Sequence, residues 1–442
     1  MTEKMKPSGI AWIGDIPQDW NIKRVKYLAS LKGRIGWQGL TSNEYIDEGP
    51  YLITGIDFQN GGIDWNNCVH VSEERWAEAP EIHIQNGDLL ITKDGTVGKV
   101  AIVSGLEGKA SLNSGVLLIR TNPDFDKRFL FWVLQSEEFW TWFRLKNAGN
   151  STIIHLYQGD FAEFSYTFPN TAEQRAIADF LDAQCAKIDS VIADIEKQIE
   201  TLQKYKKSLI TEAVTKGLDR SVPTKDSGID WIGAIPTHWN TNRLRYIATV
   251  KTGPFGTQLS ADEYVDEGVP IINVKNIGYG SILAEDLDFV PESVADRLSV
   301  HRLKLDDIVF GRKGAVDKHA IITDEYVDWV QGSDCIRVRS NSEIDSGYLN
   351  YLFDSTYFGS YVMLYAVGST MPSMSSDILL NARILVPPVQ EQKDIAAYLN
   401  NQCGKINAII TNKQAQLDTI RSHKKSLIYE YVTGKKRVTE VN

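Results

Sequence analysis

The chain has 442 residues, and its 47 Lys and Arg against 57 Asp and Glu give a formal net charge of −10. Hydrophobic residues make up 43% and charged residues 24% of the sequence, which excludes a largely disordered chain and indicates several buried cores. The first twenty residues contain no apolar run, so we expect no secretory signal. No stretch approaches the ~18 apolar residues of a membrane span, and the four cysteines do not make a disulfide framework. We therefore expect a soluble, cytoplasmic protein.

Residues 1–171 mix short apolar runs with glycine-containing turns. The runs at 88–92, 100–103 and 116–120 predict strands. The stretch 129–143 is rich in Trp and Phe and predicts a buried helix.

The segment from 172 to 215 contains neither Gly nor Pro, which predicts one long helix. A helix of about 43 residues is ~65 Å long. Its apolar residues recur at alternating steps of four and three, which is the pattern of a coiled-coil seam. The seam residues are Leu181, Cys185, Ile188, Ile192, Ile195, Ile199 and Leu202.

From about residue 218 the sequence repeats itself, with an offset of 219 residues that becomes 218 further along. Segments 227–236, 391–393 and 424–428 repeat 8–17, 173–175 and 206–210. The second copy predicts strands at 307–311, 319–322 and 335–339 and a helix at 348–364. A second seam follows, with one polar interruption at Lys413, and consists of Leu399, Cys403, Ile406, Ile410, Lys413, Leu417 and Ile420.

Two equivalent seams in one chain favour pairing with each other, although an ordinary bundle helix is the alternative for either seam alone. The second helix begins beyond the second mixed region, so the pairing must be antiparallel. We expect an α+β fold in which two similar mixed α/β domains are separated by a two-helix antiparallel coiled coil, with an internal pseudo-twofold repeat. The expected boundaries are 1–171 for domain 1, 172–217 for the first long helix, 218–389 for domain 2, and 390–442 for the second long helix and tail.

No catalytic or metal-binding constellation is recognisable. Segment 94–100 fails the spacing of a phosphate-binding loop and lacks its hydroxyl. The chain has no Asn/Asp-Pro-Pro-aromatic tetrapeptide of the kind that holds the target amine in amino-methyltransferases. Cys68, His70 and His83 make at most half a zinc site. We therefore expect neither catalysis nor a metal site in this chain.

Three pairs of loops are candidates for contact with DNA. A basic, glycine-containing hairpin brings backbone amides and cationic side chains close to phosphates and base edges, whereas a solvated turn is the alternative for each pair. The hairpins 92–99 and 311–318 contribute Thr92, Lys93, Thr96, Lys99, Arg312, Lys313 and Lys318. The loops 32–42 and 251–260 contribute Arg34, Trp37, Gln38, Thr41, Ser42, Lys251, Phe255, Thr257, Gln258 and Ser260. The segments 147–152 and 366–371, in which Ser and Thr are alternatively helix caps, contribute Asn150, Ser151, Thr152, Ser369, Thr370 and Met371.

Three motifs, each present in both copies, carry a resemblance to a known family. They are the opening Ser-Gly-Ile-x-Trp-Ile-Gly-x-Ile-Pro-x-x-Trp at 8–20 and 227–239, the junction Pro-x-x-x-Glu-Gln-Arg/Lys-x-Ile-Ala at 169–178 and 387–396, and the closing Lys-Lys-Ser-Leu-Ile-x-Glu-x-Val-Thr at 206–215 and 424–433. With them, essentially the whole chain resembles the specificity subunit of type I restriction–modification systems. Lys413 on the seam is a departure that is expected to loosen the coiled coil locally.

The resemblance implies that each mixed domain is a target recognition domain that reads one half of a split, asymmetric site in double-stranded DNA. It implies that the coiled coil sets the gap and docks two modification subunits, which bind S-adenosylmethionine and methylate adenine. Two restriction subunits with ATP and Mg would add translocation and cleavage for host defence. The chain itself would hold no cofactor and perform no catalysis.

Two other classes of function are alternatives. A structural tether would bind partner proteins through its two similar domains and have no affinity for DNA. An enzyme of unrecognised type would be active as the isolated chain. The different loop tips within a shared framework favour recognition over tethering, and the missing motifs disfavour the enzyme.

Overall fold

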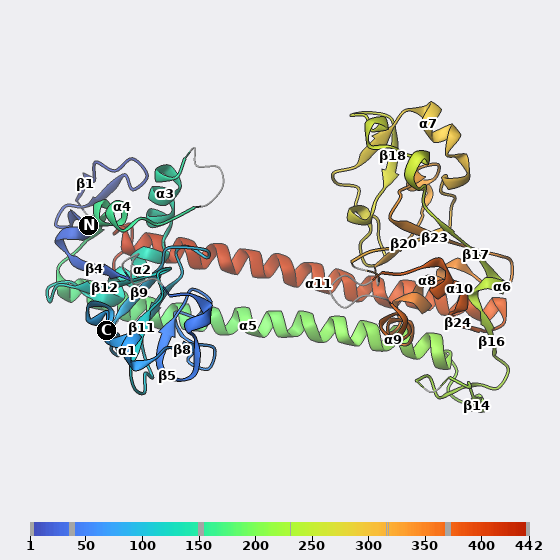
Figure 1. The fold of residues 1–442 in the computed structure, drawn as a ribbon, viewed down its shortest axis with the longest axis horizontal. Coiled ribbons are helices and arrows are strands. Elements are labelled where there is room, and N and C mark those ends of the chain that lie inside the picture. Colours follow the sequence, from blue (N-terminus) through green and yellow to red (C-terminus); the bar gives the residue numbers. More distant parts are fainter. Residues whose placement is uncertain are drawn as a thin grey trace. The chain divides into compact units, whose positions relative to one another are not determined.

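The computed structural model describes residues 4–34, 40–148, 154–229, 231–314, 316, 318–366 and 373–438. The chain forms two compact units, Met1–Ile195 with Ala415–Asn442, and Glu196–Gln414. Two long helices, α5 (Thr171–Lys216) and α11 (Val389–Val432), each contribute a part to both units (Figure 1). Each unit therefore combines one mixed domain with one segment of each long helix.

The first unit is built on a four-stranded antiparallel sheet of order β10-β9-β12-β4. Its strands are β4 (Ala29–Gly33), β9 (Leu89–Thr92), β10 (Val100–Ile102) and β12 (Val116–Thr121). In a second sheet β5 (Ile46–Ile53) pairs in parallel with β11 (Ala110–Leu112) and antiparallel with β8 (Val69–His70). Small two-stranded pairs are β1 (Met5–Pro7) with β2 (Asp15–Pro17), β3 (Asn21–Arg24) with β13 (Ser165–Phe168), and β6 (Phe58–Gln59) with β7 (Gly62–Ile63). The short helices are α1 (Glu73–Ala77), α2 (Lys127–Gln135), α3 (Glu137–Lys146) and α4 (Gln158–Glu163).

Successive residues of a strand point to opposite faces of the sheet. In the four-stranded sheet both faces are buried. On β9, Leu89 and Ile91 join a core that includes residues of α2, α3 and the long helices. The intervening Leu90 joins a second core beneath β11. Continuous apolar runs, rather than alternation of apolar and polar residues, therefore mark the central strands.

The second unit repeats this plan. Its four-stranded sheet has the order β17-β23-β20-β21, and its three-stranded sheet the order β19-β18-β22. The strands are β17 (Ala248–Thr252), β18 (Val269–Ile272), β19 (Asp288–Val290), β20 (Ile308–Gly311), β21 (His319–Ile321), β22 (Val330–Gln331) and β23 (Cys335–Ser340). The two-stranded pairs are β14 (Thr224–Asp226) with β15 (Ala234–Pro236) and β16 (Asn240–Arg243) with β24 (Arg383–Val386). The short helices are α6 (Leu244–Ile247), α7 (Glu292–Arg297), α8 (Ser346–Asp354), α9 (Thr356–Tyr365) and α10 (Ser376–Asn381).

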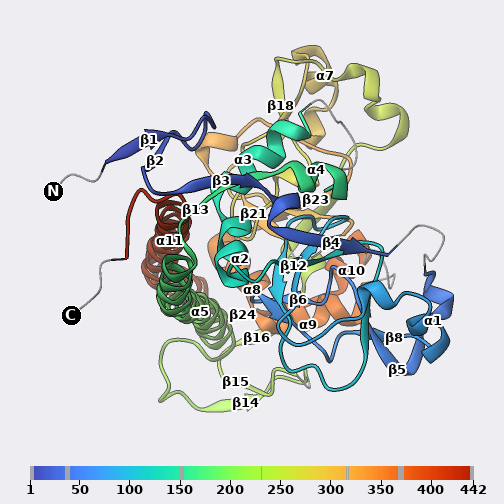
Figure 2. The same cartoon turned by 90° about the vertical axis from the view of Figure 1, so that its left-hand side faces the viewer.

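Within each unit the segments of α5 and α11 lie side by side and run antiparallel (Figures 1 and 2). In the first unit the Phe180 ring lies 4.5 Å from the ring of Tyr431, and Lys424 Nζ lies 2.6 Å from Asp189 Oδ1. As the residue number rises along α5, the number of its partner on α11 falls, which defines the antiparallel direction.

The second unit has the same helix pairing. Lys413 donates a hydrogen bond of 2.5 Å to Gln198, and Lys206 donates one of 3.0 Å to Asn407. All residues named for the two seams are buried or half-buried, Lys413 among them. Burial therefore follows the four-and-three spacing along both helices.

The long helices also complete the domain cores. Ile428 and Val432 of α11 belong to the core of the first unit, and the Thr167 hydroxyl of β13 donates a 3.1 Å hydrogen bond to the Val432 carbonyl. In the second unit α5 contributes Ile210 and Val214 to the core. In the part of the chain that the structure describes, no helix has the length and apolar character needed to cross a membrane.

Candidate nucleic-acid interface

The first basic hairpin joins β9 to β10, and Thr92 shapes its turn. Thr92 is fully buried; its hydroxyl donates to the Thr96 carbonyl and accepts from the Lys99 amide at 2.9 Å. Gly98 has φ +84°, and a Cβ there would lie 2.4 Å from the ring of Trp140, so the turn needs glycine. The expectation that Thr92 contacts DNA is therefore corrected, since its side chain is part of the hairpin's interior.

The exposed side of this hairpin carries Thr96 and Lys99. Both side chains reach the Gly55 carbonyl, Lys99 Nζ at 3.2 Å and Thr96 Oγ1 at 3.4 Å. Lys93 is half-buried, and its backbone is fixed by hydrogen bonds to Gly115 and Leu156. The hairpin thus presents an ammonium group and a hydroxyl on a rigid backbone.

The second hairpin, between β20 and β21, has different contacts. The Arg312 guanidinium lies over the Phe255 ring at 4.6 Å, and Arg312 Nε is buried without a hydrogen-bond partner. Lys313 is exposed, with Nζ 3.4 Å from Asp334 Oδ1, and Lys318 Nζ lies 5.5 Å from the centre of the Tyr279 ring. The Arg312–Phe255 contact joins two loops that the sequence singles out separately.

Arg34 is a core residue and not a surface contact. Only 4% of it is exposed, and its guanidinium donates to the Leu112 carbonyl at 2.8 Å and to Ser111 Oγ at 3.1 Å. A side chain held in this way does not reach a guanine in a groove. We therefore withdraw Arg34 from the proposed interface.

The remaining residues of the second loop pair have several placements. Thr41 and Ser260 cap short turns through Glu44 and Glu263, so these side chains bond within their own loops. Other side chains of this loop pair are exposed or half-buried: Ser42, Lys251, Phe255 and Gln258. The predicted residues that fall outside the described ones are Trp37, Gln38, Asn150, Ser151, Thr152, Ser369, Thr370, Met371 and the side chain of Thr257.

Sequence reasoning missed the partners of these cations. Tyr279 and Asp334 lie on separate loops from the hairpin that they contact, and no local motif marks either residue. It also missed a charge pair that both four-stranded sheets contain, between the residue before β9 or β20 and an arginine of the neighbouring strand β12 or β23. Arg339 binds the fully buried Asp307 through two hydrogen bonds of 2.6 and 2.7 Å, and Arg120 binds Asp88 at 2.9 and 2.8 Å. Their shared offset of 219 residues is the only sequence signal for this pair.

The described residues contain no group of three or more His, Cys, Asp or Glu side chains placed to hold a metal ion. Two residues of the half zinc site, His83 and Cys68, take part in packing within the first unit. His83 stacks on Trp76 with ring centres 3.6 Å apart, and burial raises the pKa of the Cys68 thiol.

The comparisons with known proteins agree with this architecture. The model of the type I restriction modification DNA specificity domain matches residues 17–201 and again residues 236–419. The chain belongs to this family. It carries two DNA specificity domains and is a specificity subunit of the type I class, as the repeated motifs predict.

Individual relatives span nearly the whole chain. The MjaVIII specificity subunit of Methanocaldococcus jannaschii is 28% identical over 437 residues, covering 97% of this chain and 95% of the relative. The EcoKI specificity subunit of Escherichia coli K12 is 22% identical over 393 residues, covering 86% and 82%. A solved chain from work on assembly and conformational transition of the type I system aligns with a TM-score of 0.66 at 16% identity, over 95% of this chain and 99% of that one. The predicted α+β fold with two similar domains and a coiled coil is confirmed.

Proposed function

We propose that the two domains of this specificity subunit read the two different halves of a split, asymmetric DNA site. The proposal rests on one observation: the two domains have the same strand order, but their loops make different contacts. The hairpin of the first domain presents Lys99 and Thr96, whereas that of the second holds Arg312 over Phe255 beside an exposed Lys313. A shared framework with different tips suits two readers of different sequences.

Lys93, Lys99, Lys313 and Lys318 are suited to phosphates, since an ammonium is a compact charge. Thr96 and the amide nitrogen of Gln258, whose oxygen accepts a 3.2 Å hydrogen bond from the Phe255 amide, are suited to base edges, because hydroxyl and amide groups pair with the donors and acceptors of the major groove. Each good base contact is worth about 1–3 kcal/mol of discrimination. A few contacts per domain therefore suffice for a specific half-site.

The coiled coil of α5 and α11 is the element proposed to set the gap between half-sites. Half-sites about one helical turn apart, ~34 Å, present their major grooves on one face of the duplex. We also propose that the long helices dock two modification subunits, that those subunits bind S-adenosylmethionine and methylate adenine at N6, and that two restriction subunits bring ATP and Mg. The chain then works in the cytoplasm beside the DNA and contributes specificity without catalysis.

The decisive experiment is a map of adenine methylation in the source organism with the gene intact, deleted, and carrying residues 1–170 of a homologue. We expect deletion to remove methylation at one split motif. The exchange should alter one half of that motif and keep the other half and the gap. A change in both halves would contradict independent readers, and unchanged methylation after deletion would favour the structural tether.

A further inference from the structure

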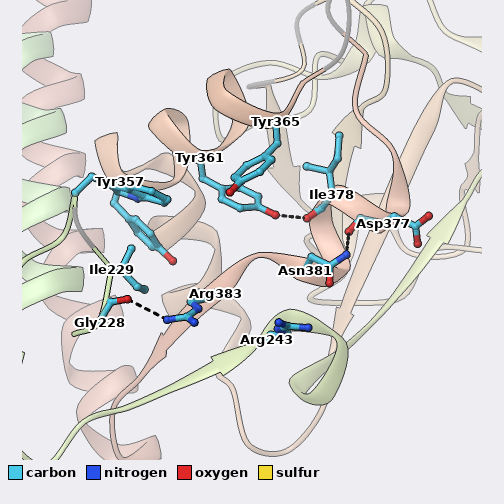
Figure 3. A pocket seen from close by; sticks show the side chains of 11 residues that line it. Gly228, Ile229, Arg243, Tyr357, Tyr361, Tyr365, Asp377, Ile378, Asn381 and Arg383 are labelled. Carbon is cyan, nitrogen blue, oxygen red and sulfur yellow. Dashed lines mark hydrogen bonds between the residues drawn. The ribbon is translucent and has the colours of Figure 1, made fainter. Parts of the chain in front are cut away.

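The second unit contains a cavity of about 590 Å³ that plays no part in the proposed reading of DNA. It lies between the opening motif of the second copy, α9, α10 and the strand pair β16·β24 (Figure 3). Its volume is in the range of small-ligand sites. None of the loop residues proposed to contact DNA lines it.

Two arginines line the cavity from neighbouring strands. Arg243 of β16 and Arg383 of β24 are directly opposite in the antiparallel register, and like charges in such positions repel. Arg383 donates to the Gly228 carbonyl at 3.1 Å. Within the described part of this unit neither guanidinium forms an ion pair with a carboxylate. An anion placed between the two arginines would relieve their repulsion.

At the matching place of the first copy, the arginine has a carboxylate partner within the chain. Arg24, the counterpart of Arg243, lies opposite Ser165 and forms a 2.7 Å ion pair with Glu163. Lys26 binds the same carboxylate at 2.6 Å. In the second copy Asn381 replaces Glu163, and Arg383 replaces Ser165. The second copy has therefore lost an internal anion and gained a cation.

The opposite wall of the cavity is aromatic. Tyr357, Tyr361 and Tyr365 follow one another along one face of α9 (Figure 3). The Tyr361 hydroxyl donates to the Ile378 carbonyl at 2.7 Å, which fixes its ring, and the Tyr365 ring lies 4.8 Å from it and is half exposed. Tyrosine faces are stacking platforms for nucleobases.

We propose that this cavity binds a nucleotide, with its phosphate between Arg243 and Arg383 and its base against the exposed ring of Tyr365, which the buried Tyr361 supports. The exposed Asp377 carboxylate of α10 also lines the cavity, and it accepts a hydrogen bond from a sugar hydroxyl or an amino group of the base. The nucleotide is either free or part of a nucleic-acid strand, and both sources present the same chemistry. The site is independent of the sequence-reading loops.

The test is isothermal titration of the full chain with AMP, adenosine, inorganic phosphate and a short single-stranded oligodeoxynucleotide. We expect AMP to bind and adenosine and phosphate to bind at least about tenfold more weakly, because each lacks one half of the contacts. An oligonucleotide that binds about tenfold more tightly than AMP identifies a strand as the source, and equal or weaker binding identifies the free nucleotide.

Two variants change the charges around the proposed phosphate position, one by removing an arginine and one by adding a carboxylate. Arg383→Ala and Asn381→Glu, which restores the carboxylate of the first copy, should each lower the affinity for AMP by about tenfold or more. Asn381→Gln keeps the amide, and Arg24→Ala acts at the matching place of the first copy, so both should bind as the wild type does. Circular dichroism confirms that each variant is folded.

Three results would overturn the proposal: no binding of AMP or of the oligonucleotide at millimolar concentration, phosphate binding as tightly as AMP, or unchanged affinity in Asn381→Glu. Because the oligonucleotide can also bind to the sequence-reading loops, its binding at the cavity is taken as the part that Asn381→Glu removes. The methylation map tests the proposed reading of DNA and does not depend on this cavity. Failure of the nucleotide proposal is therefore distinguishable from failure of the proposed reading of DNA.

Discussion

At the scale of single residues, Glu138 is an acidic side chain enclosed in the interior of the first unit. It is fully buried on α3; its Oε1 accepts a 3.3 Å hydrogen bond from the Thr167 amide, and its Oε2 has no hydrogen-bond partner. Burial raises the pKa of this carboxyl well above 4.5, and the amide hydrogen bond only partly opposes the effect. Two titratable groups that interact with it are Tyr166 of β13 and Tyr429 of α11, and neither supplies a positive charge.

Glu138→Gln should therefore stabilise the protein in a pH-dependent way. In the unfolded chain the carboxyl ionises above pH ~4.5, while the folded state keeps it neutral up to its raised pKa. The wild type then loses up to about 1.4 kcal/mol of stability per pH unit in that window. The difference in free energy of unfolding between variant and wild type should grow as the pH rises above ~4.5 and level off once the pH exceeds the raised pKa. A constant difference would show that the carboxyl is not neutral in the folded protein.

Lys99 and Lys313 are the cations whose proposed role is simplest to measure. Replacing either with Ala should weaken binding of the complex to DNA at low salt and reduce the slope of log K against log salt by about one. Lys204→Ala is the matched control, because that lysine is exposed on α5 in an ion pair with Glu200. Salt dependence identical to that of the wild type would remove the residue from the interface.

Sequence reasoning succeeds for local periodicity and fails for individual polar side chains. The spacing of Leu181, Cys185 and Ile188 fixes which face of α5 is buried, since a helix repeats within a few residues. Arg34 shows the opposite case. Its partners Ser111 and Leu112 are 77 and 78 residues away, so a loop that reads as basic and exposed instead places its arginine in a core.

Loop contacts are unpredictable for the same reason. The stacking of Arg312 on Phe255 joins segments more than fifty residues apart, and nothing in either segment specifies the other. The repeat does preserve such information, because Asp88–Arg120 and Asp307–Arg339 share one offset. Comparison of the two copies is therefore the strongest sequence signal for tertiary contacts in this chain.

At the scale of the elements, Lys413 interrupts an otherwise apolar seam. Its ammonium bonds the exposed amide of Gln198, while the equivalent residue in the first copy is the buried Ile195. Lys413→Ile should stabilise the helix pair in the second unit by about 1 kcal/mol, the scale of burying one or two methylene groups.

Amide hydrogen exchange along α11 measures this effect. Exchange on either side of position 413 should slow in Lys413→Ile. It should not slow in Lys405→Ile, since Lys405 is exposed and off the seam. Equal effects of the two substitutions would indicate helix propensity rather than packing.

At the scale of the whole molecule, the coiled coil is the proposed ruler. Four residues added at facing positions of α5 and α11 should widen the gap of the methylated motif by one to two base pairs, because they lengthen the helices by ~6 Å. Four residues added after Asp219, which lies beyond α5, should leave the gap unchanged. An unchanged gap in the first variant would contradict the ruler.

The first unit is assembled from both ends of the chain, and this has a consequence for biosynthesis. The ribosome must deliver Ile428 and Val432 before that unit can fill its interior, whereas residues 196–414 emerge as one uninterrupted piece. The part made first is thus finished last, the reverse of the usual order for nascent multidomain chains. A premature stop codon near position 415 would spare the second unit and leave the first with an open apolar core, as a substrate for cellular proteases.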